Sequence, residues 1–284
     1  MEQKATAIID IGSNSIRYLG KNPEKQLTTT RLAEGLITTG MLSEAAMERS
    51  IAAIACFVQK AHAEGLTPYA YATSAVRDAH NRTEFLARVK RACGICIDVL
   101  SGKREAQYAR LGAAAQGGIV DVGGGSSQIV TEGFAASYPV GCVRAKEWGE
   151  QSGARSMEAL QETLFSRFAG VYRFPRLHVP CWTGVGGTVT TIAALSRNMT
   201  VYDRTIMPAI VLSQADVEAQ AYALYAEGDA VRAQHPLLAQ RHDVIVEGAL
   251  ILLYIMRGMG IHTLHVSDAD GMEGYRAYLS QRKA

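Results

Sequence analysis

The sequence lacks the features that mark membrane, secreted and disordered proteins. It has no run of about twenty apolar residues, since the longest candidate, 244–256, is interrupted by Glu247 and Gly248. The N-terminus has no long apolar segment of the kind found in signal peptides. Proline is scarce, with 7 residues, and hydrophobic residues reach 48% against 20% charged residues, which excludes disordered, collagen-like and low-complexity classes. We therefore expect a cytoplasmic globular protein without a membrane span.

Cysteine is also too sparse for a disulfide framework. The five cysteines are odd in number and scattered along the chain, which is typical of reduced thiols in small core positions. Cys93 and Cys96 form a CxxC motif, but no second pair and no paired histidines follow at zinc spacing. A metal or redox role for this motif is therefore not favoured.

The chain has little excess charge of either sign. Its formal net charge is +2, and its aromatic residues do not alternate with basic residues as a base-stacking surface would. A nucleic-acid partner is therefore not expected. Basic residues do concentrate in two predicted helices, where they form either one lane for an anionic substrate or two unrelated solvated faces. These residues are Arg82, Arg88, Lys90, Arg91, Lys103, Arg104 and Arg110.

The sequence does contain a regular alternation of strand and helix patterns. Its 284 residues exceed what one compact core usually accommodates, which favours two domains. Short β-branched runs predict strands at 5–11, 15–19, 68–72, 95–100, 118–122, 128–131, 134–140 and 262–266. Amphipathic or apolar periodicity predicts helices at 43–63, 82–92, 104–115, 155–169, 188–196, 213–226 and 243–259, with a further helix at the C-terminus. This alternation indicates an α/β fold.

One motif near the N-terminus is repeated in the middle of the chain. DIGSNS from Asp10 and DVGGGSS from Asp121 both read as an apolar strand, an Asp, a turn rich in glycine and hydroxyl groups, and a second strand. Two such units predict two similar α/β lobes that face each other across a cleft. We place the first lobe at 1–116 and the second at 117–284, with a C-terminal helix at about 269–284 that packs back on the first.

Three glycine-rich turns predict phosphate binding. Glycine tolerates the backbone angles that aim successive N–H groups at an anion, and it has no Cβ in the way. The third turn, GVGGT at 184–188, leads directly into a helical pattern, and a helix N-terminus attracts phosphate. The Asp that ends each strand before the first two turns can hold Mg²⁺ or order a water. The alternative is three structural hairpins.

The sequence resembles the exopolyphosphatase and guanosine pentaphosphate phosphohydrolase family over essentially its whole length. Eight motifs occur in the family's order: DIGSNSIR (10–17), ATSAVR (72–77), SGKREA (101–106), DVGGGSS (121–127), GCV (141–143), GVGGT (184–188), VIVEG (244–248) and VSD (266–268). The resemblance implies the fold of actin, hexokinase and Hsp70, with an active cleft between two ribonuclease-H-like lobes. It also implies removal of the terminal phosphate from inorganic polyphosphate or guanosine pentaphosphate with Mg²⁺, for which Mn²⁺ is an alternative.

The resemblance further assigns roles to individual residues. Glu105 is implied as the general base that activates water, and Asp121 as a catalytic, metal-associated residue. Asp10 is its counterpart in the first lobe, so the implied metal ligands are these three carboxylates. The alternatives are that Glu105 is a solvated helix residue and that Asp10 caps its own turn. The implied phosphate-binding residues are Gly12, Ser13, Asn14, Ser15, Arg77, Gly123, Gly124, Gly125, Ser126, Ser127, Gly186, Gly187 and Thr188.

Four residues leave parts of the family comparison open. Arg17 either faces this site or turns outward as an ordinary surface residue. Gln128 stands where many relatives have Glu after the GGGS turn, which removes a charge from the expected metal site. His242 and Asp243 form an HD dipeptide, but they are interpreted as a helix start, because they precede an apolar helical pattern and lack the distant His and Asp partners that an HD-type site needs.

These observations lead us to expect a phosphoanhydride hydrolase that removes the terminal phosphate of polyphosphate. Guanosine pentaphosphate hydrolysis by the same residues is the nearest alternative. A catalytically weak module that senses polyphosphate or a nucleotide is another, and a sugar kinase of the same fold is a further one. The sequence leaves the oligomeric state open, with a homodimer as one alternative.

Overall fold

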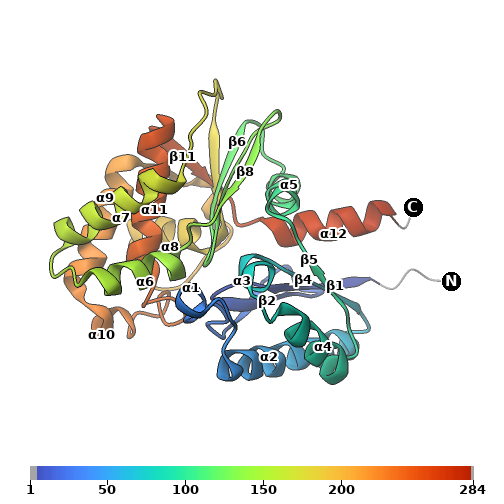
Figure 1. Cartoon of the computed structure of the whole chain (residues 1–284). Helices are drawn as coiled ribbons and strands as arrows, with labels where there is room; N and C mark the ends of the chain where they lie inside the picture. Colours follow the sequence, from blue (N-terminus) through green and yellow to red (C-terminus); the bar gives the residue numbers. More distant parts are fainter. Residues whose placement is uncertain (1–4, 283–284) are drawn as a thin grey trace.

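The computed structural model describes residues 5–282, which form two β-sheets surrounded by helices (Figure 1). The strand order is β3-β2-β1-β4-β5 in the first sheet and β10-β11-β9-β6-β7-β8 in the second. In each sheet an antiparallel three-stranded meander continues into two strands parallel to its first strand, and the second sheet ends with β10, which is antiparallel to β11. Both sheets therefore have the ribonuclease-H-like arrangement, and the predicted two-lobed α/β fold is confirmed.

The first-sheet strands are β1 (Thr6–Ile11), β2 (Ser15–Leu19), β3 (Gln26–Thr29), β4 (Thr67–Ala72) and β5 (Ile97–Val99). The second-sheet strands are β6 (Gly118–Val122), β7 (Ser127–Val130), β8 (Ala135–Tyr138), β9 (Trp182–Val185), β10 (Val211–Ser213) and β11 (Thr263–Val266).

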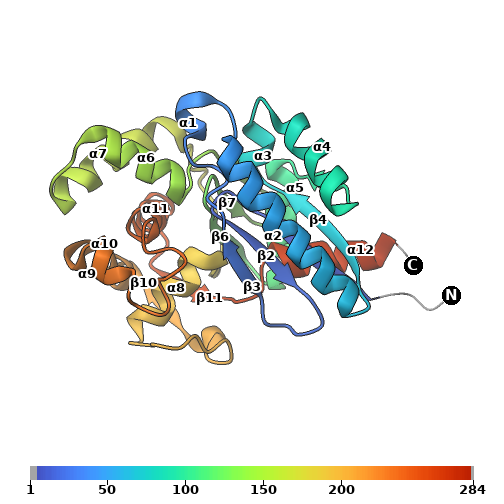
Figure 2. The ribbon, with the colours of Figure 1, turned by 90° about the horizontal axis from the view of Figure 1, so that it is seen from below.

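Helices cover both faces of the first sheet, as Figures 1 and 2 show. On one face lie α2 (Glu44–Ala63) and α4 (Arg82–Cys93), and on the other lie α5 (Gly102–Ala113) and α12 (Gly271–Arg282). The longer helices around the second sheet are α6 (Cys142–Ser152), α7 (Met157–Val171), α8 (Gly186–Ser196), α9 (Gln214–Glu227) and α11 (Ile245–Met259). Shorter elements are α1 (Leu36–Thr39), α3 (Ser74–Asp78), α10 (Asp229–Arg232) and η1 (Met207–Ala209).

The apolar alternation of β1 explains how an aspartate reaches the interior. Ile9 and Ile11 point into the core beneath α2, whereas Ile8 points into the core beneath α12. Asp10 follows Ile8 on the same face, since side chains two apart on a strand point the same way. A strand buried on both faces therefore carries its one charged side chain to the end of the sheet, where the cleft begins.

The C-terminal helix α12 packs closely on α5. A Cβ added at Gly112 would lie 2.8 Å from the backbone nitrogen of Gly274, so the two helix backbones approach each other where neither has a side chain. Tyr275 of α12 continues this contact, because its ring lies 5.3 Å from that of Tyr108 and 4.9 Å from that of Tyr71. The helix α12 thus joins α5 to the first sheet.

Most of the predicted elements are present, with some differences. The helix predicted at 43–63 is α2, and its predicted N-cap Ser43 accepts a hydrogen bond from the Ala46 amide at 3.3 Å. Strands β3, β9 and β10, helix α6 and the short helices α1, α3 and α10 were not predicted from the sequence. The expectation that the cysteines are core residues is wrong for Cys56 and Cys96, which are exposed, whereas Cys142 is buried. Among residues 5–282, no helix combines the length and the apolar character needed to cross a membrane.

Candidate active site

A cleft of about 120 Å³ lies between the two lobes. Most of the residues predicted for the site line this cleft: Asp10, Gly12, Ser13, Asn14, Ser15, Glu105, Asp121, Gly123, Gly124, Ser126, Gly186, Gly187 and Thr188. Three predicted phosphate-binding residues do not: Arg77, Gly125 and Ser127. The Ser127 hydroxyl instead lies 2.6 Å from the Tyr172 hydroxyl inside the second lobe, because strand alternation turns it away from the cleft.

The repeated motif forms the same tight hairpin in both lobes. The Gly12 amide donates to the Ser15 carbonyl at 3.1 Å, and the Gly123 amide donates to the Ser126 carbonyl at 2.9 Å. The two turns also meet: a Cβ on Gly124 would lie 3.0 Å from the Asn14 amide nitrogen, closer than side chains normally approach backbone. The glycines of the second turn thus allow the two loops to come together at the cleft.

The third glycine-rich turn brings the N-terminus of α8 to the same place. Gly186 is in the left-handed region, with φ of 83°, and lies directly against the Asp121 carboxylate. Gly187 follows against the guanidinium of Arg241, which also lines the cleft. A side chain at either position would overlap these charged groups, so glycine, which has no side chain, fits at both positions. The positive end of the α8 dipole therefore adjoins the cleft.

The two aspartates occupy equivalent positions but have different neighbours. Asp10 pairs in register with Arg17 on the next strand, and Asp121 pairs in register with Gln128. Arg17 donates from Nε to Asp10 at 2.9 Å, so Asp10 has a positive partner within the protein. The Gln128 amide nitrogen instead donates to the hydroxyls of Ser126 at 2.9 Å and Ser137 at 3.1 Å. Asp121 therefore has no counter-charge at the corresponding position.

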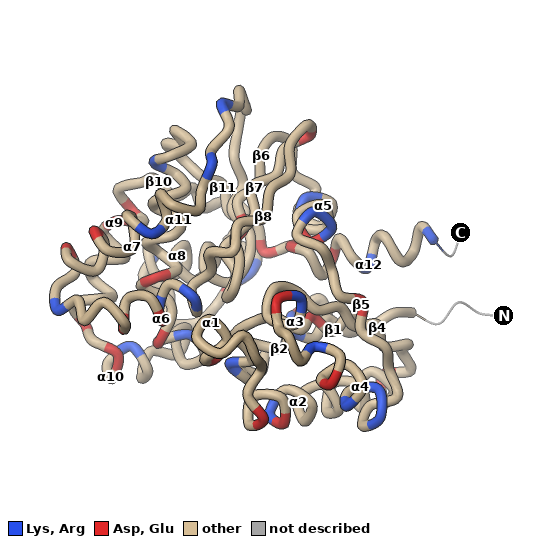
Figure 3. The backbone as a smooth tube through the Cα atoms, viewed as in Figure 1, with Lys and Arg blue, Asp and Glu red and all other residues tan. Residues whose placement is uncertain are grey.

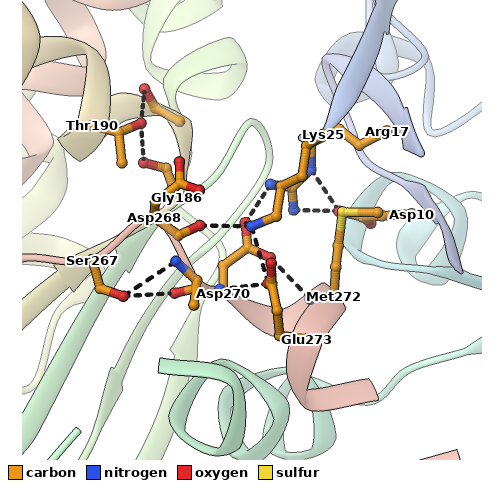
Figure 4. Close-up of polar contacts among 12 residues, drawn as sticks. Asp10, Arg17, Lys25, Gly186, Thr190, Ser267, Asp268, Asp270, Met272 and Glu273 are labelled. Carbon is orange, nitrogen blue, oxygen red and sulfur yellow. Dashed lines mark hydrogen bonds and ion pairs between the residues drawn. The ribbon is translucent and has the colours of Figure 1, made fainter. Parts of the chain in front are cut away.

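Arg17 also links the two halves of the chain, as Figure 4 shows. Besides Asp10, its guanidinium binds the buried carboxylate of Asp270, which precedes α12. Lys25 adds ion pairs of 3.1 Å to Asp270 and 3.0 Å to Glu273. Burial alone would raise the pKa of Asp270, but Arg17 and Lys25 hold that pKa well below its ordinary value. Arg17 thus faces the site, which decides between the two orientations left open by the sequence.

Glu105 lies in the first turn of α5, where Ser101 caps the helix by accepting the Arg104 amide at 3.3 Å. Arg77 of α3 donates to the Glu105 carboxylate at 2.9 Å and to the Leu100 carbonyl at 3.0 Å. The structure therefore places Arg77 against Glu105 and outside the lining of the cleft. Glu105 itself is not a solvated helix residue, because its side chain is only 16% exposed and faces the cleft.

Burial and mutual repulsion change the titration of the cleft carboxylates. Desolvation raises the pKa of Glu105 to about 7, although Arg77 opposes the shift. Desolvation also raises the pKa of Asp121 to about 8, and the neighbouring charges of Asp270 and Glu105 add to the effect. The pKa of Asp10 is raised by burial despite its pairing with Arg17. Desolvated carboxylates that repel one another create a site that favours a bound cation.

The basic residues of the two helices named in the sequence analysis do not form one continuous lane. Figure 3 shows them on α4 and α5, which cover opposite faces of the first sheet. Arg88 pairs with Glu44 at 2.7 Å, and Arg104 pairs with Asp98 at 2.8 Å. These arginines are therefore engaged locally, as expected for two solvated faces.

Comparison with known proteins decides the family. The model of the Ppx/GppA phosphatase family matches residues 15–281. The chain belongs to the Ppx/GppA family. Exopolyphosphatase 2 of Mycobacterium tuberculosis is 30% identical to it, over 94% of this chain and 96% of that protein. The guanosine-5'-triphosphate,3'-diphosphate pyrophosphatase of Aeromonas hydrophila is 28% identical, over 94% of this chain but 58% of its own length.

Solved structures agree with this assignment. The crystal structure of the Aquifex aeolicus Ppx/GppA family member is 26% identical and superposes with a TM-score of 0.72, covering 99% of both chains. The crystal structure of an exopolyphosphatase-like protein superposes with a TM-score of 0.88 at 24% identity, covering 98% of this chain and 99% of that chain, which shows the shared fold. The family resemblance read from the eight motifs is thus confirmed.

Several cleft residues of this Ppx/GppA protein were not predicted from the sequence. Arg241, Tyr71 and Ser74 line the cleft, and Asp270 binds the guanidinium of the cleft residue Arg17. No local pattern marks Asp270 or Arg241, because each reaches the cleft from a segment distant in sequence. The register of the β1–β2 hairpin was the available signal for Arg17, since it sets this residue opposite Asp10.

The donor set of the cleft fits a magnesium ion that is only partly held by protein. Among the described residues, no three His, Cys, Asp or Glu side chains are grouped closely enough to enclose a metal. However, Asp10 Oδ1 is buried and meets no hydrogen-bond donor in the described part of the chain, and Asp121 and Glu105 line the same cleft. Mg²⁺ usually takes one or two carboxylates and completes its shell with water and substrate phosphate. The cleft offers that arrangement.

Proposed function

We propose that this chain is an exopolyphosphatase that hydrolyses the terminal phosphoanhydride of inorganic polyphosphate and releases orthophosphate. The observation that carries the proposal is the convergence of three glycine-rich turns and a desolvated carboxylate, Glu105, on one cleft. Such turns suit a chain of phosphates, whereas a buried base suits activation of water. The family membership and the relative named exopolyphosphatase 2 support the same reading.

In the proposed mechanism, the turns at Gly12–Ser15 and Gly123–Ser126 hold the terminal phosphates, with the N-terminus of α8 beside them. Glu105 accepts a proton from a water molecule as the water oxygen attacks the terminal phosphorus. The bond from that phosphorus to the bridging oxygen breaks, and the shortened chain keeps the bridging oxygen. A magnesium ion at Asp121, with Glu105 and Asp10 nearby, would neutralise charge on the phosphate oxygens.

Hydrolysis of guanosine pentaphosphate by the same residues is the alternative that the Aeromonas relative favours. The test is phosphate release from short polyphosphate, long polyphosphate and guanosine pentaphosphate with Mg²⁺, then with Mn²⁺ and with EDTA. The proposal expects the largest kcat/KM with polyphosphate and loss of activity in EDTA. A larger kcat/KM with guanosine pentaphosphate would favour the alternative. Binding of polyphosphate without release of phosphate would make the chain a sensor and overturn the proposal.

Gln128→Glu should lower the Mg²⁺ concentration that gives half-maximal activity, by about 3- to 10-fold, because hard cations prefer charged oxygen ligands. The side chain lines the cleft opposite Asp121, and its present partners Ser126 and Ser137 can donate to a carboxylate. Titration of activity against free Mg²⁺ in both proteins measures the effect. Gln107→Glu, which adds the same charge on the exposed side of α5, is the control. Coincident curves for all three proteins would show that substrate phosphate and water complete the coordination.

A further inference from the structure

A line of alternating charges crosses from the second lobe to Glu105. Arg144 of α6 donates from Nε to the carbonyl of Gly125, in the second-lobe turn, at 2.8 Å. Its guanidinium also forms an ion pair with Asp78 at the end of α3, in the first lobe. The other Asp78 oxygen lies 3.5 Å from Nε of Arg77, which binds Glu105 at 2.9 Å. The phosphate-binding turn and the candidate base are therefore joined through three side chains.

These contacts differ from ordinary surface ion pairs in burial and in geometry. The side chains of Arg144, Arg77 and Glu105 are 17%, 22% and 16% exposed, whereas that of Asp78 is 35% exposed, so the two ends of the line are better shielded from water than its middle. Each arginine also binds a main-chain carbonyl, Gly125 for Arg144 and Leu100 for Arg77, which fixes its orientation. Partly buried, multiply bonded guanidinium groups hold their partners in one geometry better than an exposed pair does.

We propose that Arg144 and Asp78 are positioning residues that orient Glu105 through Arg77 and tie its placement to the second-lobe phosphate turn. This inference rests on the proposed hydrolase function and adds two residues to it. Arg144 acts on the base at a distance, because its contact with Asp78 adds to the Leu100 carbonyl in keeping Arg77 directed at the carboxylate. A displacement of the Gly125 turn would then change the position of the Glu105 carboxylate through the same contacts. A shift of about 1 Å in a base can change its rate contribution about a hundredfold.

The test measures kcat and KM for phosphate release in Arg144→Met, Asp78→Asn and the double variant. Each single variant should lose about 10- to 100-fold in kcat while KM changes less than about 3-fold, because substrate contacts stay in place. The double variant should lose no more than the more affected single variant, because both substitutions interrupt one line of contacts. Arg144→Lys, which keeps the charge, should recover part of the kcat. Arg257→Met is the control, since Arg257 forms an ion pair with Glu218 on the outside of the second lobe.

Three results would overturn the inference while wild-type hydrolysis stands. A normal kcat in Arg144→Met would show that the contact does not matter for the reaction. A rise in KM alone would make Arg144 a substrate-binding residue. Losses that multiply in the double variant would show two independent roles. If the wild-type protein releases no phosphate from any of the substrates, the proposed function fails first, and that outcome is distinct from all three.

Discussion

Glu105→Gln should lower kcat for phosphate release by about 10²- to 10⁴-fold and leave KM within a few-fold of the wild-type value. The amide keeps the size of the side chain and can still interact with Arg77 through its carbonyl oxygen, but it cannot accept a proton from water. The three glycine-rich turns proposed to bind phosphate are unchanged, so substrate binding should persist. Steady-state phosphate release, with direct measurement of polyphosphate binding, separates these two effects.

The pH profile gives this prediction a second readout. Glu105 must be ionised to act as a base, and burial raises its pKa to about 7, so kcat/KM of the wild-type protein should rise with pH up to about that value. The residual activity of Glu105→Gln should lack the part of this rise near pH 7, whereas any rise from ionisation of Asp121, whose pKa is about 8, should remain. Glu84→Gln on α4 is the matched control, since Glu84 lies on the opposite side of the first sheet. Near-wild-type kcat in Glu105→Gln would reject Glu105 as the base.

Asp121→Asn should abolish most of the activity and yet stabilise the fold at neutral pH. The activity should fall by about 10²-fold or more, because the variant loses the one cleft aspartate without a protein counter-charge. Stability should increase because the native pKa of Asp121 is about 8, far above its ordinary value of 3.8. A carboxyl whose pKa is raised in the folded state contributes its full stabilisation below the pKa of the unfolded state. That contribution is lost as the pH rises through the pKa of the folded state.

The measurement is thermal unfolding in EDTA between pH 4 and 8, with and without added Mg²⁺. The free energy of unfolding of the wild-type protein should decrease over this range. In Asp121→Asn the decrease should be smaller, by on the order of 1 kcal/mol at pH 7.5. Added Mg²⁺ should raise the melting temperature of the wild-type protein more than that of the variant. Glu132→Gln, at an exposed turn, is the control. Equal responses to Mg²⁺ in wild type and Asp121→Asn would remove Asp121 from the metal site.

The strands and turns that carry the site could be predicted from sequence because their signals are local. The run TAIIDIGSNS determines a buried strand, a turn and a return strand within one short segment, and the same holds at Asp121. Helix α6 was missed because it starts at Cys142 after Gly141, which provides no side-chain cap. Strand β9 was missed because it is only four residues long, contains Gly184 and follows a segment without periodicity.

The partners of the site residues could not be predicted, because they depend on how distant segments meet. Arg77 was assigned to phosphate on the family pattern, but α3 and α5 come together so that its guanidinium faces Glu105. Asp270 lies far along the chain from Asp10 and Arg17, and nothing in the sequence around it indicates a buried ion pair. The sequence thus predicts which chemical groups are available, whereas tertiary packing decides which of them neutralise one another.

The contact between α5 and α12 has a consequence for the order in which the protein becomes active during synthesis. Gly112 and Gly274 meet backbone to backbone although more than half of the chain separates them. The ribosome adds residues from the N-terminus, so Glu105 emerges long before the helix on which α5 rests. Closing so long a loop is a late and slow step in folding. Nascent chains that stop before α12 should therefore hold both glycine-rich turns but an unsupported Glu105, and a growing chain should not hydrolyse its substrate before α12 has been made.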